Sequence, residues 1–61
     1  MEQLKNSIRK MDTDIIRESV ITIGGGHVGQ DARMVRAALI DIYIERTSEA
    51  AGDRLMDFIG L

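Results

Sequence analysis

The sequence predicts an all-α protein: a small helical hairpin or three-to-four-helix domain around a glycine-rich turn, assembled as a homo-oligomeric bundle. Three observations support this prediction. Apolar residues recur every three or four positions over most of the chain, which is the period of one helix face. Proline, the strongest helix breaker, does not occur in the sequence. Gly24 and Gly60 directly follow apolar stripes, where a left-handed residue ends a helix.

The length predicts a single domain, residues 1–61, whose folded state needs stabilising contacts beyond those within one chain. A chain of 61 residues buries only about 60% of its unfolded surface, so its folded state is marginally stable. No cysteine and only one histidine are present, which excludes disulfides and a Cys- or His-rich metal site. We therefore expect self-association to supply the missing burial, with no metal and no cofactor.

The first half of the chain carries two apolar stripes. Their members are Leu4, Ile8, Met11 and Ile15, then Ile16, Val20 and Ile23. Asp12 and Thr13 are good N-cap residues between them, so we expect one helix to about Met11. After Met11 the chain either bends or begins a new helix, and the helix then continues to Ile23 and ends at Gly24. The alternative is a strand over residues 19–23, because four consecutive β-branched residues occupy 20–23.

The second half predicts a helix from Asp31, and Thr47-Ser48-Glu49 indicates either a restart or a helix that runs through. Asp31 can cap the helix that it begins, where it places a negative charge at the positive end. Because residues 32–44 are apolar on most of the helix circumference, we expect them to lie at the centre of an oligomer. Gly52, if within the last helix, either costs about 1 kcal/mol relative to alanine or permits a close helix contact. The predicted oligomer interface consists of Val35, Leu39, Ile42, Leu55, Phe58 and Ile59.

The segment between the two halves holds four of the six glycines and the only histidine. Gly24, Gly26 and Gly29 follow the pattern G-x-G-x-x-G, after an apolar run and before a helix. Locally this resembles the fingerprint of the dinucleotide-binding family, which implies a pyrophosphate at the helix N-terminus. The multi-stranded sheet of that family does not fit in 61 residues, so a plain interhelical turn is the favoured interpretation. The candidate ligand-binding residues are Gly24, Gly25, Gly26, His27, Gly29, Arg33 and Arg36.

Few side chains indicate a catalytic or ligand-binding role. Imidazole is a common general base, but no nucleophile lies beside His27, so we predict no catalytic residue. Arg17, with Arg33 and Arg36, has the chemistry to bind phosphate or carboxylate in a bidentate manner. Acidic residues recur every fourth position from Asp41 to Asp57, which is typical of a solvated helix face.

These features predict a non-enzymatic helical binding protein, an accessory, regulator or inhibitor that acts through protein–protein contacts. The alternative is an oligomeric binder of a small anionic ligand, such as a nucleotide, at residues 24–29. A net charge of −2 disfavours nucleic acid as a partner, because nucleic-acid binding needs a basic surface. The polar start of the chain and the lack of a long apolar run predict a cytoplasmic protein without a membrane partner.

Overall fold

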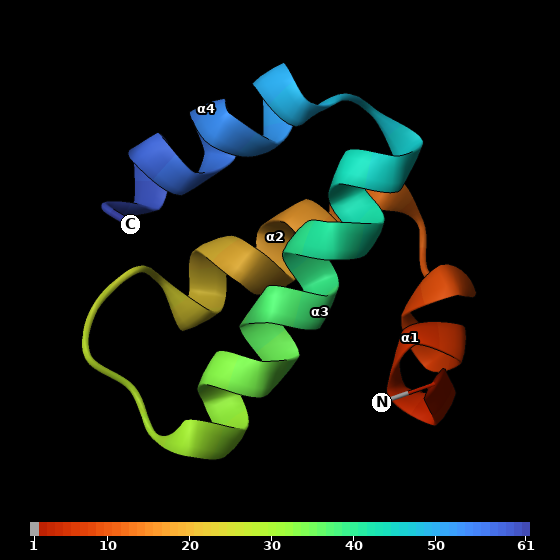
Figure 1. The fold of residues 1–61 in the computed structure, drawn as a ribbon, viewed down its shortest axis with the longest axis horizontal. Helices are drawn as coiled ribbons and strands as arrows, with labels where there is room; N and C mark the ends of the chain where they lie inside the picture. Colours follow the sequence, from red (N-terminus) through yellow and green to blue (C-terminus); the bar gives the residue numbers. More distant parts are fainter. Residues whose placement is uncertain (1) are drawn as a thin grey trace.

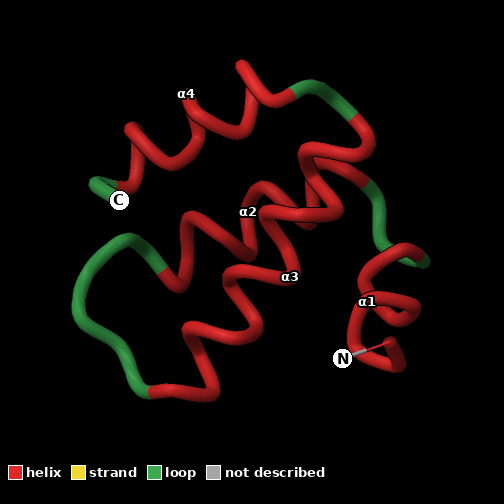
Figure 2. The backbone as a smooth tube through the Cα atoms, in the orientation of Figure 1, coloured by secondary structure: helices red, strands yellow, loops and turns green. Residues whose placement is uncertain are grey.

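The computed structural model describes residues 2–61 as four α-helices, with no strand in that range. Helix α1 spans Glu2–Arg9, α2 spans Thr13–Ile23, α3 spans Gln30–Arg46 and α4 spans Glu49–Ile59. Figures 1 and 2 show α3, the longest helix, running through the middle of the molecule. Each of the other three helices packs against α3. The prediction of an all-α fold is therefore confirmed.

The helix ends follow local signals. Gly24 ends α2 with φ +75°, and its N–H donates to the Val20 carbonyl over 2.8 Å. The Ser48 hydroxyl accepts from the Ala51 N–H over 3.1 Å at the start of α4. Gly60 ends α4 in the left-handed conformation, with φ +86°. These three positions are the helix boundaries that the sequence predicts.

The sequence alone did not establish the end of α2 or the start of α3. Residues 19–23 are helical, not extended, because Ile16 and Val20 bury one face of α2 completely and this packing outweighs the weak β preference of the segment. Helix α3 begins at Gln30, with Gly29 at the cap position. Asp31 therefore lies in the first turn and does not cap α3.

The core is built around α3. Its members are Ile8, Ile16, Val20, Ala38, Leu39, Ile40, Ile42 and Leu55. The side chains that α3 contributes at 38–40 and 42 are each at most 7% exposed within this single chain. Three helices of the same chain cover these four residues, whereas Met34 in the same helix is 44% exposed. The central position of residues 32–44 in an oligomer remains a prediction.

Two arginines of α3 bind the ends of neighbouring helices. Arg36 is 9% exposed, and its guanidinium donates to the carbonyl of Gly24 over 2.7 Å and to that of Gly26 over 3.4 Å. Arg46 donates to the carbonyls of Arg9 and Met11 at the end of α1. Each arginine supplies donors to carbonyls that a helix end or a turn leaves without an intrahelical partner. Together they hold both connections of α2 against α3.

Two glycines allow close approach to α4. A Cβ on Gly25 would lie 2.2 Å from the Ile59 carbonyl oxygen, so the loop and the end of α4 touch through their backbones. A Cβ on Gly52 would lie 2.4 Å from Cγ1 of Ile44. Gly52 is buried within α4, and it is the close-contact residue that the sequence analysis offers as one alternative. The position of α4 thus depends on the absence of a side chain at Gly25 and at Gly52.

Candidate functional site

The predicted ligand-binding glycines lie in the loop that joins α2 to α3. Gly24 and Gly25 are half-buried, whereas Gly26, His27 and Gly29 are exposed. The contacts described for Gly24 and Gly26 direct their carbonyl oxygens to Arg36. A carbonyl oxygen repels an anion, so this part of the loop has the polarity of a cation site that the chain's own arginine fills. The anion site at this loop stays a prediction.

The two predicted arginines line one shallow hollow of about 410 Å³ beside α3. Arg33 is exposed there, while Arg36 is committed to the loop carbonyls. The other lining residues include Asp41 and the apolar side chains of Ile40 and Met56. Because a carboxylate shares the hollow and one guanidinium is engaged, this hollow has only one available cation for an anionic ligand.

The predicted interface residues separate into buried and accessible groups. Leu39, Ile42 and Leu55 are at most 4% exposed and belong to the core of the single chain. Val35 and Ile59 are half-buried, and Phe58 is 68% exposed. An oligomer would therefore use the second group, which does not form one continuous stripe on α3.

A larger hollow, of about 630 Å³, is a groove lined by residues of α1, α2 and α3. Its apolar lining includes Leu4, Ile8, Ile15, Ile23, Val35 and Leu39. We call this surface the α1–α2 groove. Ile15 is 51% exposed there, so a large aliphatic side chain is presented to the outside. The first apolar stripe of the sequence thus divides: Ile8 enters the core, and Ile15 stays at the surface.

The charged residues that line the α1–α2 groove are both acidic. Asp14 and Glu18 stand one helical turn apart on α2, and no lysine, arginine or histidine lines the groove. Glu18 lies 3.7 Å from the guanidinium of neighbouring Arg17, a pair with both side chains well exposed. Asp14 forms no ion pair among the described residues. The groove therefore combines an apolar floor with two carboxylates at its edge, of which Asp14 has no ion-pair partner among the described residues.

The wall that α1 contributes to this groove is held by exposed ion pairs. Lys5 pairs with Asp41 over 3.5 Å, and Arg9 pairs with Glu45 over 3.4 Å. Exposed pairs contribute about 0.2–1 kcal/mol each. The start of the predicted acidic stripe thus serves to fasten α1 to α3. The stripe does not continue as one face, because α3 ends before α4 begins.

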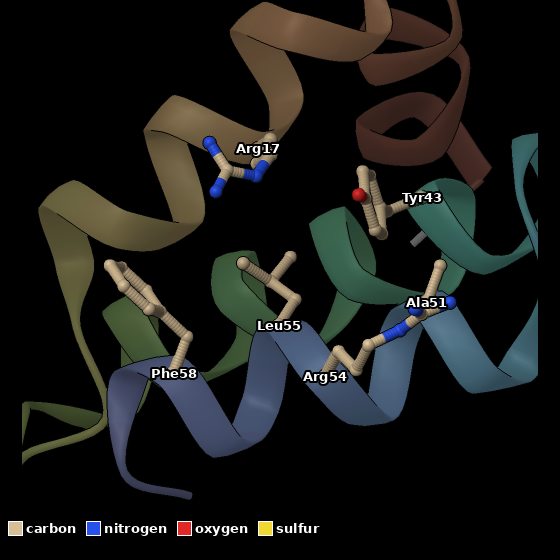
Figure 3. Close-up of a pocket in the computed structure, with 6 residues that line it drawn as sticks. All are labelled: Arg17, Tyr43, Ala51, Arg54, Leu55 and Phe58. Carbon is tan, nitrogen blue, oxygen red and sulfur yellow. The ribbon is translucent and has the colours of Figure 1, made fainter.

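A third hollow, of about 410 Å³, opens on the other side of α2 and is lined by residues of α2, α3 and α4. Figure 3 shows Arg17 on one side and Arg54 on the other, with Leu55 between them. We call it the arginine cleft, and it is lined by Arg17, Tyr43, Ala51, Arg54, Leu55 and Phe58. Arg17, a phosphate-binding candidate from the sequence, lines this cleft, whereas Arg33 and Arg36 line a different hollow. Tyr43 lines the same cleft through the packing of α3 and Arg54 through the packing of α4, which no local spacing reveals.

No group of three or more histidine, cysteine, aspartate or glutamate side chains in residues 2–61 is arranged to hold a metal ion. Within the same range, no helix has the length and apolar character needed to cross a membrane. Comparisons with protein-family models, with curated proteins and with solved structures find no match to this chain. The α1–α2 groove and the arginine cleft are therefore the candidate sites of this chain.

Proposed function

We propose that this chain is a non-enzymatic protein-interaction module that binds an amphipathic helix of a partner protein in the α1–α2 groove. The observation that carries the proposal is the combination of a large apolar groove with an acidic edge. A groove between helices accepts the apolar face of another helix, with anchors at spacings of three and four residues. A regulator or inhibitor that works through contacts needs such a surface and no catalytic group.

The charges define the partner's chemistry. Asp14 and Glu18 form a negative edge, so a helix with lysine or arginine beside its apolar stripe complements the groove. Complementary edge charges steer association and set the orientation of the partner. A neutral or acidic helix would bring either no compensation or like charges to the same edge.

A second copy of the chain fits the groove less well. The exposed side of α4 carries Phe58 and Arg54, but it also carries the two carboxylates of Asp53 and Asp57. Those two carboxylates would approach Asp14 and Glu18 in a contact between copies. Only Phe58 on that face is a large apolar side chain, which is too little to fill a groove of about 630 Å³. Self-association thus remains a separate proposal, and a partner protein is the occupant of the groove.

The test uses a synthetic amphipathic peptide of about 15 residues, which forms four helical turns, with leucines on one face and lysines along one edge. The matched control peptide carries glutamate in place of lysine. Binding to the full chain is measured by fluorescence anisotropy and by amide chemical shifts. We expect the lysine peptide to bind more tightly and to shift amides of α1 and α2.

Variants sharpen the test. The Asp14→Asn/Glu18→Gln double variant should lose the preference for lysine over glutamate, while Asp31→Asn, outside the groove, should keep it. Ile15→Ser should weaken both peptides. Equal binding of the two peptides, or unchanged binding by Ile15→Ser, contradicts the proposal. Light scattering supplies a third outcome: a dimer that Ile15→Ser dissociates would assign the groove to a second copy instead.

A further inference from the structure

Helix α1 has the chemistry that the proposed function assigns to a partner. Leu4 and Ile8 are apolar residues one helical turn apart, and a basic residue directly follows each of them in the sequence, Lys5 in the first case and Arg9 in the second. Ile8 is 3% exposed and belongs to the core, and Leu4 packs against that core. Helix α1 is therefore a short basic amphipathic helix that the chain binds to itself.

The surface of α3 that faces α1 matches this pattern. The Asp41 carboxylate lies 3.5 Å from the Lys5 ammonium, and four residues later the Glu45 carboxylate lies 3.4 Å from the Arg9 guanidinium. Arg46 donates to two main-chain carbonyls at the end of α1. We call Asp41, Glu45 and Arg46 the α1 seat. Its contacts need only two cations one turn apart and the free carbonyls of a helix end, so they select a pattern rather than this particular helix.

The attachment of α1 to the seat is shallow. Ile8 is the one buried residue of α1, whereas α2 and α4 each bury two. The carboxylates of Asp41 and Glu45 are 59% and 57% exposed, so water and salt weaken both ion pairs. With eight residues, α1 is also shorter than the about 12–15 residues that an isolated helix needs in water. Docking and folding of α1 are therefore one equilibrium, because α1 off the seat would lose its helical structure.

From these observations we infer that α1 is an internal ligand of α3, and that a longer basic amphipathic helix of the partner protein displaces it from the α1 seat. The inference rests on the proposed function for the chemistry of the partner. Leu4, Ile8 and Met11 also line the α1–α2 groove, so release of α1 removes one wall of the groove and joins the groove to the seat. A helix of about 15 residues, four turns long, replaces the contacts of α1 and also reaches the apolar floor.

Displacement gives α1 a regulatory effect on the same site. A chain whose binding-competent state is only partly populated binds its ligand with an apparent affinity that is lower by that fraction. Helix α1 thus sets a threshold that a partner helix must exceed, and any change that loosens α1 should tighten partner binding.

The experiment adds the lysine peptide described above to the full chain and follows each helix by amide chemical shifts and hydrogen exchange. At saturation, α1 amides should move to random-coil shifts and lose their protection, because the peptide occupies the α1 seat. Amides of α4 should keep both. If the peptide binds while α1 stays helical and protected, the inference is wrong and the proposed function stands. A peptide that binds neither the unaltered chain nor the variants below contradicts the proposed function as well.

Variants of α1 give effects of opposite sign for the two cases. Ile8→Ser should tighten peptide binding about tenfold or more, because it weakens the internal competitor. If Ile8 only lined the groove, the same change would weaken binding. Arg9→Gln should tighten binding by up to about fivefold, which corresponds to the loss of one exposed ion pair, and it keeps the test available if Ile8→Ser unfolds.

Lys10→Gln is the matched control for charge, since Lys10 is exposed and forms no ion pair among the described residues. It should bind the peptide like the unaltered chain. Weaker binding by a folded Ile8→Ser variant, or equal tightening by Arg9→Gln and Lys10→Gln, overturns the inference. So does a dimer in light scattering that the peptide dissociates, because the α1 seat would then hold α1 of a second copy.

Discussion

The two hollows lie on opposite sides of α2, and their chemistry is opposite as well. The α1–α2 groove has an aliphatic floor and two carboxylates, whereas the arginine cleft has two guanidiniums, a phenol and an exposed aromatic ring. Both lie against α3, and both take residues from α2. The comparison shows that a small acidic chain can present two unlike surfaces when a single helix separates them.

The separation follows from the helical period. Ile16 and Val20 point into the core and are fully buried. Ile15 lies on the groove side, and Arg17 lies on the cleft side. Because successive residues are rotated by about 100°, one turn of α2 serves the groove, the core and the cleft. The two sites therefore depend on the same packing but on different outer helices, α1 for the groove and α4 for the cleft.

The largest effect is expected from a substitution in the shared core, which should abolish the α1–α2 groove and the arginine cleft together. Ile42 of α3 is 1% exposed in the shared core, and Ile42→Asp would bury an unpaired carboxylate there. Such a change costs several kcal/mol, which is comparable to the whole stability of about 3–9 kcal/mol expected for a domain of this size. Circular dichroism should show loss of the helical signal at 25 °C. Ile15→Asp, at an exposed position, should remain folded; equal unfolding by both variants would contradict this account of the core.

A smaller effect should act on the cleft alone. Gly25→Ala places a Cβ 2.2 Å from the Ile59 carbonyl oxygen, whereas a Cβ on Gly26 meets nothing within 4 Å. Neither glycine has a positive φ, so the two substitutions differ in the space available to the new methyl group. We expect Gly25→Ala to destabilise by about 1–3 kcal/mol, as overpacking does, and to shift α4 amides more than α1 amides. Urea unfolding and amide shifts measure this, and Gly26→Ala is the control. Indistinguishable variants would mean that α4 does not rest on the loop.

The smallest effect should act on the groove alone. Glu45→Gln removes the ion pair that Arg9 forms over 3.4 Å with both side chains well exposed. The loss should be about 0.2–1 kcal/mol and should shrink with added salt. Hydrogen exchange should then become faster for α1 amides and stay unchanged for α4 amides. Faster exchange in α4 would show that the two outer helices are coupled, and the contrast between the sites would fail.

Local features of the sequence predicted the helix ends better than the sites. Gly24, Ser48 and Gly60 act through hydrogen bonds to residues three or four positions away, so their spacing is visible in the chain. The core face of α2 was also visible, because Ile16 and Val20 share one stripe. Where a surface forms depends instead on which helices meet. Arg54 and Arg17 line the same cleft because α4 packs against α3, and no periodicity in the sequence indicates that packing.

The glycine loop illustrates the same limit from the other side. Its glycine content indicates a conformationally free backbone. The phosphate-binding interpretation of residues 24–29 relies on backbone amides that face outward. Arg36 instead binds the carbonyls of Gly24 and Gly26. The sequence placed Arg36 near the loop correctly, but it could not distinguish an arginine that awaits a ligand from one that already binds its own backbone.

The backbone contact between Gly25 and Ile59 also has a consequence for how the chain tolerates new sequence. Glycine-rich connections are ordinarily the places where a tag or a foreign segment is inserted with least damage. Here the first half of the connection is fastened, by Arg36 from one side and by the end of α4 from the other. His27, exposed and beyond both contacts, marks the position where an inserted segment would leave them intact. An insertion only two residues earlier, at Gly25, would break the backbone contact with Ile59 and loosen the end of α4.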